Sequence, residues 1–281
     1  MARDISGRRL TLCGNEIYVE ESGSGDTCVI FESGGGSGRT LWDPVAPLLG
    51  DIARTVAYDR AGRGRSGRSS PAQTLDDMAS TLVALVEMLA PKRLILVAHS
   101  MGGLIVRRAI ESLPRPAGLV MLDTTPDAAP IYDDWSATAR KTDRILAAQQ
   151  ALAHCRPLMR VLTRPYGRMF PADTYATMLS EDFTPEGIAQ TRREIAAVAM
   201  GISEFRSRSP RLPNCEVILI SATRVNRWQA RNHATIREYQ RRYAEQVQGR
   251  FEDADCGHIV PAERPDQVAA AVRRLADVPR R

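Results

Sequence analysis

Apolar runs of strand length alternate with segments of helical periodicity along the first part of the chain. Apolar residues recur at spacings of three and four over 73–90 and 104–113, which predicts amphipathic helices. The segments between and before them are short, mainly apolar and without a polar face, as in strands that are covered on both sides. These segments are 27–33, 54–59, 93–100 and 118–123. The alternation predicts an α/β protein with a mostly parallel sheet between layers of helices.

A hairpin precedes this pattern and a helical segment interrupts it. Residues 8–13 and 16–22 flank a Gly14-Asn15 turn, which is typical of two antiparallel strands. After about Thr125 the chain has helical pieces and bulky side chains but no strong strand. Strand and helix patterns then return at 217–221, 229–247, 250–255 and 265–276. We therefore expect a helical cap of residues 126–210 inserted into a core of residues 1–125 and 211–281.

Composition narrows the class of protein. The chain has 281 residues, of which 43% are hydrophobic, enough to bury a sizeable core. No run approaches the roughly 20 apolar residues of a membrane span, and the first ten residues lack the apolar segment of a signal peptide. The five cysteines are scattered and odd in number, without a C-x-x-C pair. This pattern argues against disulfides and zinc, so we expect a cytoplasmic protein without a metal ion.

Positive charge is spread along the chain. The net charge is +5, and nearly all the cations are arginine. The densest cluster is DRAGRGRSGRS, which contains Arg60, Arg63, Arg65 and Arg68. Such a stretch could contact phosphates, but it has no aromatic side chain on which a base could stack. We interpret it as a solvated loop that Asp59 and Arg60 tie to the sheet, and we expect no nucleic-acid partner.

The sequence LVAHSMGG at 96–103 places Ser100 between an apolar strand and an amphipathic helix. A nucleophile at such a turn is strained and exposed, and the tight turn needs small residues two positions before and after it. Ala98 and Gly102 occupy these positions, with alanine where glycine is usual. Ser100 is therefore the candidate nucleophile.

A histidine is the most frequent general base for such a nucleophile, and the chain has four. His258 follows the last predicted strand in the sequence CGHIVP, ahead of the closing helix. His99 lies within the turn itself and should point away from Ser100. His154 lies in the cap, and His233 lies in a polar helix from which it could face the site. His258 is the best candidate for the base.

Several motifs along the chain together resemble the α/β-hydrolase fold superfamily. They are the Gly-rich loop at 33–36, the turn of Ser100, YDRAGRGRSG at 58–67 and CGHIVPAERP at 256–265. The resemblance covers nearly the whole chain and implies an eight-stranded, mostly parallel sheet with a helical lid. It also implies a Ser–acid–His triad with Ser100 and His258, and no cofactor. An oxyanion hole would be formed by the N–H groups of Met101 and of Gly35 or Gly34.

The acid of the implied triad is harder to assign. In most of the family it follows the seventh strand, but here that strand is followed by ATRVNRW, which has no carboxylate. The family's second solution places the acid at the end of the sixth strand, where Asp123 stands. Asp127, Asn226 or a dyad without an acid remain alternatives. Arg224 and Arg227 should then lie near the rim of the site.

These residues predict a serine hydrolase that cleaves a carboxylic ester or a lactone through an acyl-enzyme. The same triad could serve amide or iminopeptide hydrolysis, acyl transfer, C–C cleavage or perhydrolysis, since the fold does not fix the reaction. Epoxide hydrolysis and dehalogenation on this fold use an aspartate nucleophile, which Ser100 argues against. A non-catalytic ligand-binding protein on the same fold is the alternative class.

The bulky side chains of the cap are candidates for the substrate pocket. They could form an apolar pocket for an acyl group or a ring, or they could pack the cap's own small core. The candidates are Trp135, Tyr132, Met159, Met169 and Phe170. We expect the substrate to be a medium-sized, largely apolar organic molecule, and leave open whether the protein forms a homo-oligomer.

Overall fold

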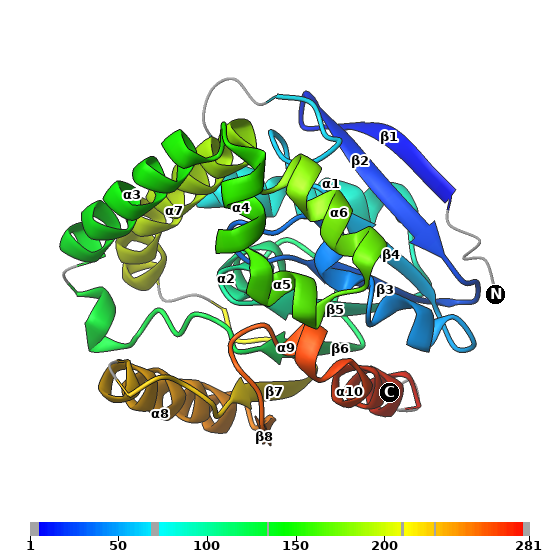
Figure 1. The fold of residues 1–281 in the computed structure, drawn as a ribbon. Helices are drawn as coiled ribbons and strands as arrows, with labels where there is room; N and C mark the ends of the chain where they lie inside the picture. Colours follow the sequence, from blue (N-terminus) through cyan, green and yellow to red (C-terminus); the bar gives the residue numbers. More distant parts are fainter. Residues whose placement is uncertain (1–5, 69–72, 134, 209–210, 228, 278–281) are drawn as a thin grey trace.

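One eight-stranded sheet runs through the computed structural model, which describes residues 6–68, 73–133, 135–208, 211–227 and 229–277 (Figure 1). The strand order is β1-β2-β4-β3-β5-β6-β7-β8. The pairs β1–β2 and β2–β4 are antiparallel, and every other neighbouring pair is parallel. The strands are β1 (Ser6–Leu12), β2 (Asn15–Ser22), β3 (Thr27–Glu32), β4 (Arg54–Tyr58), β5 (Arg93–His99), β6 (Gly118–Leu122), β7 (Glu216–Ala222) and β8 (Arg250–Ala254). The predicted eight-stranded α/β fold is confirmed.

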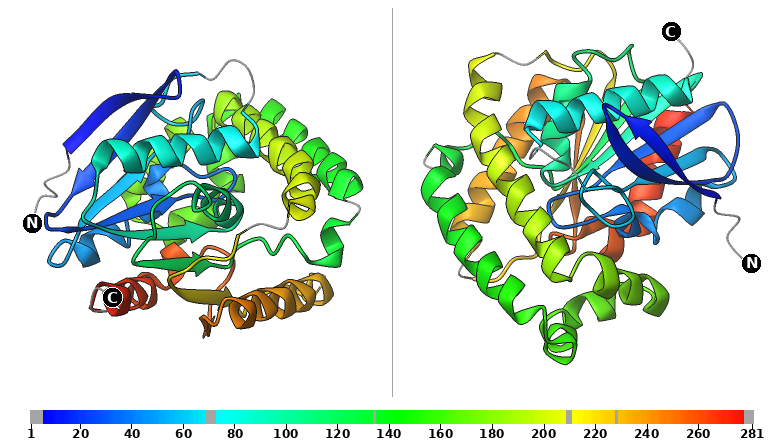
Figure 2. Two further views of the ribbon diagram at one scale, coloured as in Figure 1. Left: turned by 180° about the vertical axis from the view of Figure 1, so that it is seen from behind. Right: turned by 90° about the horizontal axis from the view of Figure 1, so that it is seen from above.

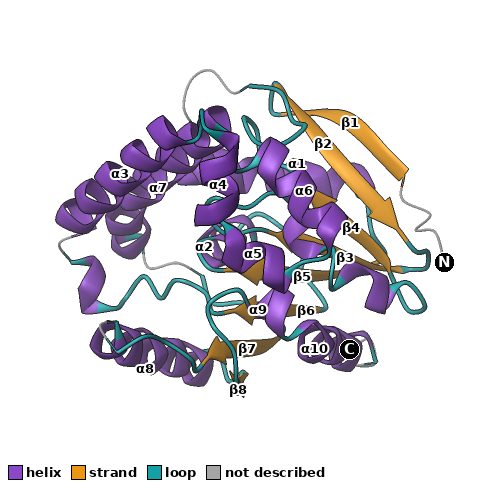
Figure 3. Ribbon diagram, viewed as in Figure 1, coloured by secondary structure: helices purple, strands orange, loops and turns teal. Residues whose placement is uncertain are grey.

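Helices cover both faces of this sheet (Figure 3). The helices of the first and last thirds are α1 (Leu75–Leu89), α2 (Gly102–Ala109), α8 (Ala230–Gln246), α9 (Val260–Glu263) and α10 (Pro265–Ala276), with the 3₁₀ turns η1 (Arg39–Trp42) and η2 (Ala46–Leu49). Along β5, Leu94 and Leu96 enter the core under α1 and α2, while Ile95 and Val97 enter the core under α10. Because alternate residues of a strand face opposite sides, a strand between two helical layers needs apolar residues at every position.

The segment between β6 and β7 is almost entirely helical. It contains η3 (Pro130–Tyr132), α3 (Trp135–Leu152), α4 (Arg156–Leu162), α5 (Arg164–Met169), α6 (Ala172–Glu181) and α7 (Pro185–Ser207). Helices α3 and α7 lie side by side, as both views of Figure 2 show. The segment leaves the sheet at the carboxyl end of β6 and returns to the amino end of β7. On the way, residues of η3 and α7 come to lie near Ser100 and His258.

Buried ion pairs attach this helical segment to the sheet. Glu194 of α7 accepts hydrogen bonds from Arg60 and Arg63, and all three side chains are almost fully buried. Arg60 also donates to Glu32 and to the carbonyl oxygens of Ser33 and Gly34. The prediction of a solvated loop is therefore wrong for Arg63, whereas Arg60 ties the loop to the end of β3, as predicted. A buried guanidinium needs carboxylate partners, and the partner on α7 is more than 130 positions away in sequence.

Replacing Glu194 with glutamine should destabilise the fold by about 3–5 kcal/mol at pH 7, because two buried arginines lose a shared carboxylate. Burial alone would raise the pKa of Glu194, but Arg60 and Arg63 lower it to about 2. Glu194 therefore contributes stability above the unfolded carboxyl pKa of about 4.3 and loses it as the pH falls toward 2. The stability difference between wild type and Glu194→Gln should shrink over that range in denaturant titrations.

The exposed carboxylate of Glu204 is the matched control, since it pairs with Arg208 at the surface of the same helix. Glu204→Gln should cost less than about 1 kcal/mol at any pH. Equal effects of the two substitutions would contradict the assignment of a buried ionic link.

Candidate active site

Ser100 lies at a strained turn between β5 and α2. Its φ angle is 54°, in the left-handed region that residues with a side chain rarely adopt. The Ser100 N–H donates to the carbonyl of Leu122, and the Ser100 carbonyl accepts from the N–H of Thr125. A Cβ atom at Gly102 would lie 2.7 Å from two backbone oxygens of the 32–33 segment, so this position needs glycine. The turn thus projects the serine side chain from the carboxyl edge of the sheet.

Three side chains from different strand ends meet at this edge. His258 Nε2 lies 3.0 Å from Ser100 Oγ, and His258 Nδ1 lies 2.6 Å from Asp123 Oδ2. Ser100 follows β5, Asp123 follows β6 and His258 follows β8. The register explains the approach, because parallel pairing aligns His99 with Leu122 and Ala222 with Ala254. When neighbouring parallel strands end at the same height in the sheet, the residues that follow them lie close together.

Asp123 is held as an ionised hydrogen-bond acceptor. Its side chain is 6% exposed, and burial alone would raise its pKa. The hydrogen bond and charge of His258, together with a hydrogen bond from Gln240, outweigh burial and hold the pKa of Asp123 below its usual range. The Asp123 backbone has a φ of 44° and donates its N–H to Ile220 of β7 at 2.7 Å.

The other acid candidates from the sequence lie elsewhere. Asp127 forms a buried ion pair with Arg107 of α2. The amide of Asn226 is paired with Gln229, to which it donates at 2.9 Å. Of the three candidates, all of them described, Asp123 is the one within hydrogen-bond distance of His258.

His99, the neighbour of Ser100 in sequence, contacts the backbone of His258. Its Nε2 lies 2.8 Å from the His258 carbonyl, which can only accept, so this nitrogen carries the proton. The two imidazole rings lie 4.7 Å apart. Burial, and secondarily the nearby His258, lowers the pKa of His99 to about 3. His99 is therefore neutral at pH 7 and holds the backbone of His258 rather than exchanging protons.

The Gly-rich loop after β3 lies against the serine. A Cβ at Gly34 would be 3.0 Å from the Cβ of Ser100 and 2.8 Å from His99 Nδ1, so only glycine allows this approach. Gly35 lines the same pocket as Ser100 and Met101. The three residues predicted to supply oxyanion N–H groups thus surround the candidate nucleophile.

A pocket of about 670 Å³ opens over Ser100 and His258. One part of its wall is mainly apolar and comes from η3, α7 and α8; it includes Ile131, Tyr132, Ile195, Val198 and Ile236. A polar part follows β7 and includes Arg224, Asn226, Gln229, Asn232 and His233. Burial raises the pKa of Tyr132 to about 12, which keeps its hydroxyl protonated. The pocket can hold a medium-sized molecule with an apolar and a polar part.

The predicted pocket residues divide into two groups. Tyr132 lines the pocket, whereas the side chain of Trp135 lies outside the described residues. Met159, Met169 and Phe170 are not among the residues that line the pocket. Pocket lining was the wrong alternative for these three, and Met159 follows the other one, since it packs in a small core of the helical segment. Met159 packs with Ala153 and Ile188, and Phe170 lies in the core cluster against which Met169 packs.

Most of the pocket wall carries no sequence signal. Ile195, Val198 and Ile236 read as ordinary core-facing residues of amphipathic helices, and only the folding of α7 and α8 over the sheet brings them to Ser100. The polar part could have been inferred from position, since it follows the carboxyl end of β7. Arg224 was expected near the rim on that ground, and its pairing with Glu263 fixes it there.

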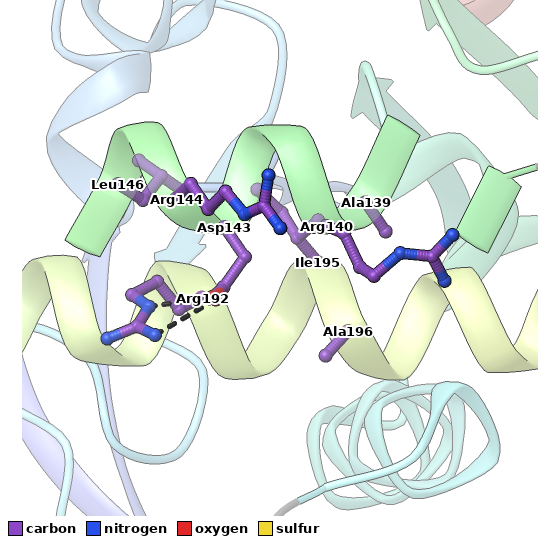
Figure 4. A pocket seen from close by; sticks show the side chains of 8 residues that line it. All are labelled: Ala139, Arg140, Asp143, Arg144, Leu146, Arg192, Ile195 and Ala196. Carbon is purple, nitrogen blue, oxygen red and sulfur yellow. Dashed lines mark hydrogen bonds and ion pairs between the residues drawn. The ribbon is translucent and has the colours of Figure 1, made fainter. Parts of the chain in front are cut away.

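A second, smaller hollow of about 310 Å³ lies between α3 and α7 (Figure 4). Arg192 pairs with Asp143 across it, and the side chains of Arg140 and Arg144 border it. Ile195 lines both this hollow and the pocket over Ser100. Ile195 of α7 therefore stands between this hollow and the pocket over Ser100.

The described residues contain neither a cluster suited to a metal ion nor a helix suited to a membrane. No group of three or more histidine, cysteine or carboxylate side chains in the described part of the chain could hold a metal ion. Among the described helices, none is both long enough and apolar enough to cross a bilayer.

The strand order, with a positive-φ residue between β5 and α2, defines the class of protein as an α/β-hydrolase fold. The chain belongs to the alpha/beta hydrolase family, whose family model matches residues 29–271. It is 27% identical over 266 residues to the lipase LipV of Mycobacterium tuberculosis, which covers 92% of this chain and 97% of that protein.

Other relatives differ in their named reactions. A protein of Variovorax paradoxus named as a carbamate hydrolase, RutD, is 30% identical over 154 residues. That match covers 53% of this chain and 54% of the relative. The chain therefore spans about half the length of this relative. The structure of the epoxide hydrolase CorEH superposes with a TM-score of 0.76 at 19% identity, over 97% of this chain and 98% of that chain. Similarity at this level shows the fold alone.

Proposed function

We propose that this protein is a serine hydrolase that cleaves a carboxylic ester or a lactone through an acyl-enzyme. The observation that carries the proposal is the alignment of Ser100, His258 and Asp123, with 3.0 Å and 2.6 Å between the facing atoms. Ser100 stands where an epoxide hydrolase of this fold would have aspartate. A serine at this turn supports acyl transfer over epoxide opening.

In the acylation step, Ser100 Oγ attacks the substrate carbonyl carbon while His258 Nε2 takes the hydroxyl proton. Asp123 accepts the Nδ1–H hydrogen bond and stabilises the imidazolium that forms. The negative charge on the former carbonyl oxygen is stabilised by the N–H groups of Met101 and Gly35, with Gly34 as the neighbouring donor. The imidazolium then donates its proton to the leaving alkoxide, and the acyl group remains on Ser100.

Water completes the cycle. His258, neutral again, takes a proton from water, and the hydroxide attacks the acyl carbonyl. The tetrahedral intermediate collapses, Ser100 leaves with the proton from His258, and the carboxylic acid is released. For a lactone, the leaving alkoxide stays attached to the acyl group, so the product is a hydroxy acid.

A fluorophosphonate probe tests the proposal most directly. Intact-mass and peptide mass spectrometry should find one adduct, on Ser100, and hydrolysis of p-nitrophenyl esters should disappear in parallel. Folded protein that forms no adduct and hydrolyses none of the esters would exclude a serine hydrolase.

Cleavage at a carbamate or amide carbonyl is the second candidate function. The relative named as a carbamate hydrolase favours it, and the polar part of the pocket wall could bind an N–H or a carbonyl group. A panel that pairs p-nitrophenyl esters of increasing acyl length with a lactone, an aryl carbamate and an anilide separates the two. We expect the ester or the lactone to have the highest kcat/KM.

Tyr132 should limit the length of the bound acyl group or alcohol. Replacing Tyr132 with alanine should raise the kcat/KM of long-chain relative to short-chain p-nitrophenyl esters by roughly tenfold, because the pocket wall opens. Met159→Ala is the matched control, since Met159 is buried outside the pocket. It should lower the melting temperature without changing the ratio. If the ratio changes equally in both variants, Tyr132 does not set the length.

A further inference from the structure

A buried chain of hydrogen bonds leads from α8 to the carboxylate of Asp123. Gln240 Nε2 donates to Asp123 Oδ1 at 3.2 Å and to the Thr124 carbonyl at 2.8 Å. Its other atom, Oε1, lies 2.6 Å from Ser221 Oγ at the end of β7. Arg237 donates to Ser221 Oγ at 3.0 Å and to the carbonyls of Ser221 and Ala222. Gln240 is 1% and Ser221 0% exposed.

The chemistry of these groups fixes the direction of every hydrogen bond in the chain. Arginine can only donate, so Ser221 Oγ accepts from Arg237. The single proton of the Ser221 hydroxyl is then free to point at Gln240, whose Oε1 accepts it. The Gln240 amide must therefore direct its NH₂ group to Asp123 and Thr124. A flipped amide would oppose its oxygen to a carboxylate and a carbonyl, and would leave the Ser221 proton without an acceptor.

The chain gives each oxygen of Asp123 its own donor. Oδ1 receives Gln240 Nε2–H, and Oδ2 receives His258 Nδ1–H. A proton on Oδ1 would meet the NH₂ group of Gln240, so the neutral acid is disfavoured. With both oxygens held, the carboxylate has no freedom to rotate away from the imidazole.

We propose that Gln240, oriented by Ser221 and Arg237, is a positioning residue that keeps Asp123 ionised and directed at His258. The inference rests on the proposed function for its kinetic consequence, but the hydrogen-bond chain can be tested without turnover. It also explains why β7 ends in a small polar residue, Ser221, after the apolar run VILI. The small side chain of Ser221 leaves room for Gln240 to reach across β7 to the residue after β6.

Other titratable groups surround this carboxylate and bear on any pH measurement. His99 and His258 interact with it from the ends of β5 and β8. Tyr132 and Cys256 are near enough for the Asp123 charge to raise their pKa values, although burial is the larger cause in both. At the far end of the chain, Arg237 pairs with Asp253. His99, Tyr132 and Cys256 keep one protonation state between pH 5 and 9. His233 of α8 also lines the pocket, so the acid limb of activity is assigned to the His258–Asp123 pair by titrating His258 itself.

The decisive variant is Gln240→Met, which keeps a similar length, adds no charge and removes the NH₂ donor to Asp123. Without this donor the charge of Asp123 favours the imidazolium form of His258 more strongly, so the acid limb of kcat/KM, the fall in activity at low pH, should move up by about half a unit. We expect kcat at pH 8 to fall by roughly 100-fold with KM within threefold of wild type, since Gln240 does not line the pocket. Gln240→Glu is less decisive, because a carboxyl group buried beside Asp123 would be protonated and could still donate a hydrogen bond.

Gln246→Met is the matched control, since it makes the same change at an exposed position of the same helix. It should leave both kcat and the acid limb unchanged. A folded Gln240→Met variant with a wild-type limb and a kcat within threefold of wild type would overturn the proposal. If Gln240→Met does not fold, Ser221→Ala carries the test, and a wild-type profile in that variant would overturn it equally.

Nuclear magnetic resonance separates this inference from the proposed function. The imidazole nitrogens of His258 can be titrated in ¹⁵N-histidine protein, whether or not a substrate is known. An upward shift of the His258 titration in Gln240→Met supports the chain even if no ester is hydrolysed. An unshifted titration in an active variant rejects the chain and leaves the serine hydrolase standing.

Discussion

Replacing Ser100 with alanine should lower kcat for ester hydrolysis by roughly 10⁵- to 10⁶-fold, as expected when the nucleophile of a triad is removed. The remaining groups could then act only on water, so a small residual rate should persist from the oxyanion donors and binding. Stopped-flow or long-incubation assays with a p-nitrophenyl ester measure the loss. Labelling by a fluorophosphonate should disappear entirely.

Ser207→Ala serves as the control, because Ser207 is exposed at the end of α7 and its hydroxyl only donates within its own helix. Its rate and labelling should match wild type. A circular dichroism melt checks that Ser100→Ala is folded, since alanine would adopt the same φ of 54°. Retention of more than about a tenth of the wild-type rate would remove Ser100 from the chemistry, because covalent catalysis contributes orders of magnitude.

Asp123→Asn should lower kcat by about 10⁴-fold near neutral pH, with the fold intact. The hydrogen-bond chain behind the residue explains why the loss should be large. Gln240 presents an NH₂ group to Oδ1, so an asparagine here would turn its oxygen to Gln240 and its own NH₂ group to His258. His258 Nδ1 would then accept instead of donate. Its proton would lie on Nε2, where it could not take the proton of Ser100.

Asp127→Asn distinguishes this effect from a general loss of charge beneath the pocket. Asp127 lies four positions later and is paired with Arg107, so its replacement should lower the melting temperature and leave kcat within threefold. A large loss of kcat in Asp127→Asn, together with a wild-type rate in Asp123→Asn, would reassign the acid. The pH profile of Asp123→Asn should also rise at alkaline pH, where hydroxide substitutes for the general base.

The end of the seventh strand shows which part of the site the sequence predicts and which part it does not. The absence of a carboxylate after VILIS directed attention to Asp123, and the structure brings that residue to 2.6 Å from His258. What the sequence did not indicate is why the end of β7 is small and polar. Ser221 belongs to a hydrogen-bond chain whose other members lie 16 and 19 positions further along on α8.

The arginine cluster after β4 shows the opposite outcome. By composition, Arg63 looked like a solvated loop residue, yet it is buried beneath α7 beside Arg60. Their partner Glu194 belongs to a helix that is distant in sequence, and no local pattern marks a carboxylate that will be buried. The same reason explains the errors for Met159, Met169 and Phe170. Periodicity indicates that an apolar side chain will be buried, but not which surface will cover it.

The sequence by itself determined the features that depend on local physics. Both faces of the central strands had to be covered, because their apolar runs are continuous, and the turn at Ser100 had to be tight, because small residues flank it at the required spacing. The tertiary structure alone decided which side chains form the pocket wall, which carboxylates neutralise the buried arginines, and that Gln240 holds Asp123. These contacts join residues more than 100 positions apart, and they form only when the helices after β6 and β7 fold back over the edge of the sheet.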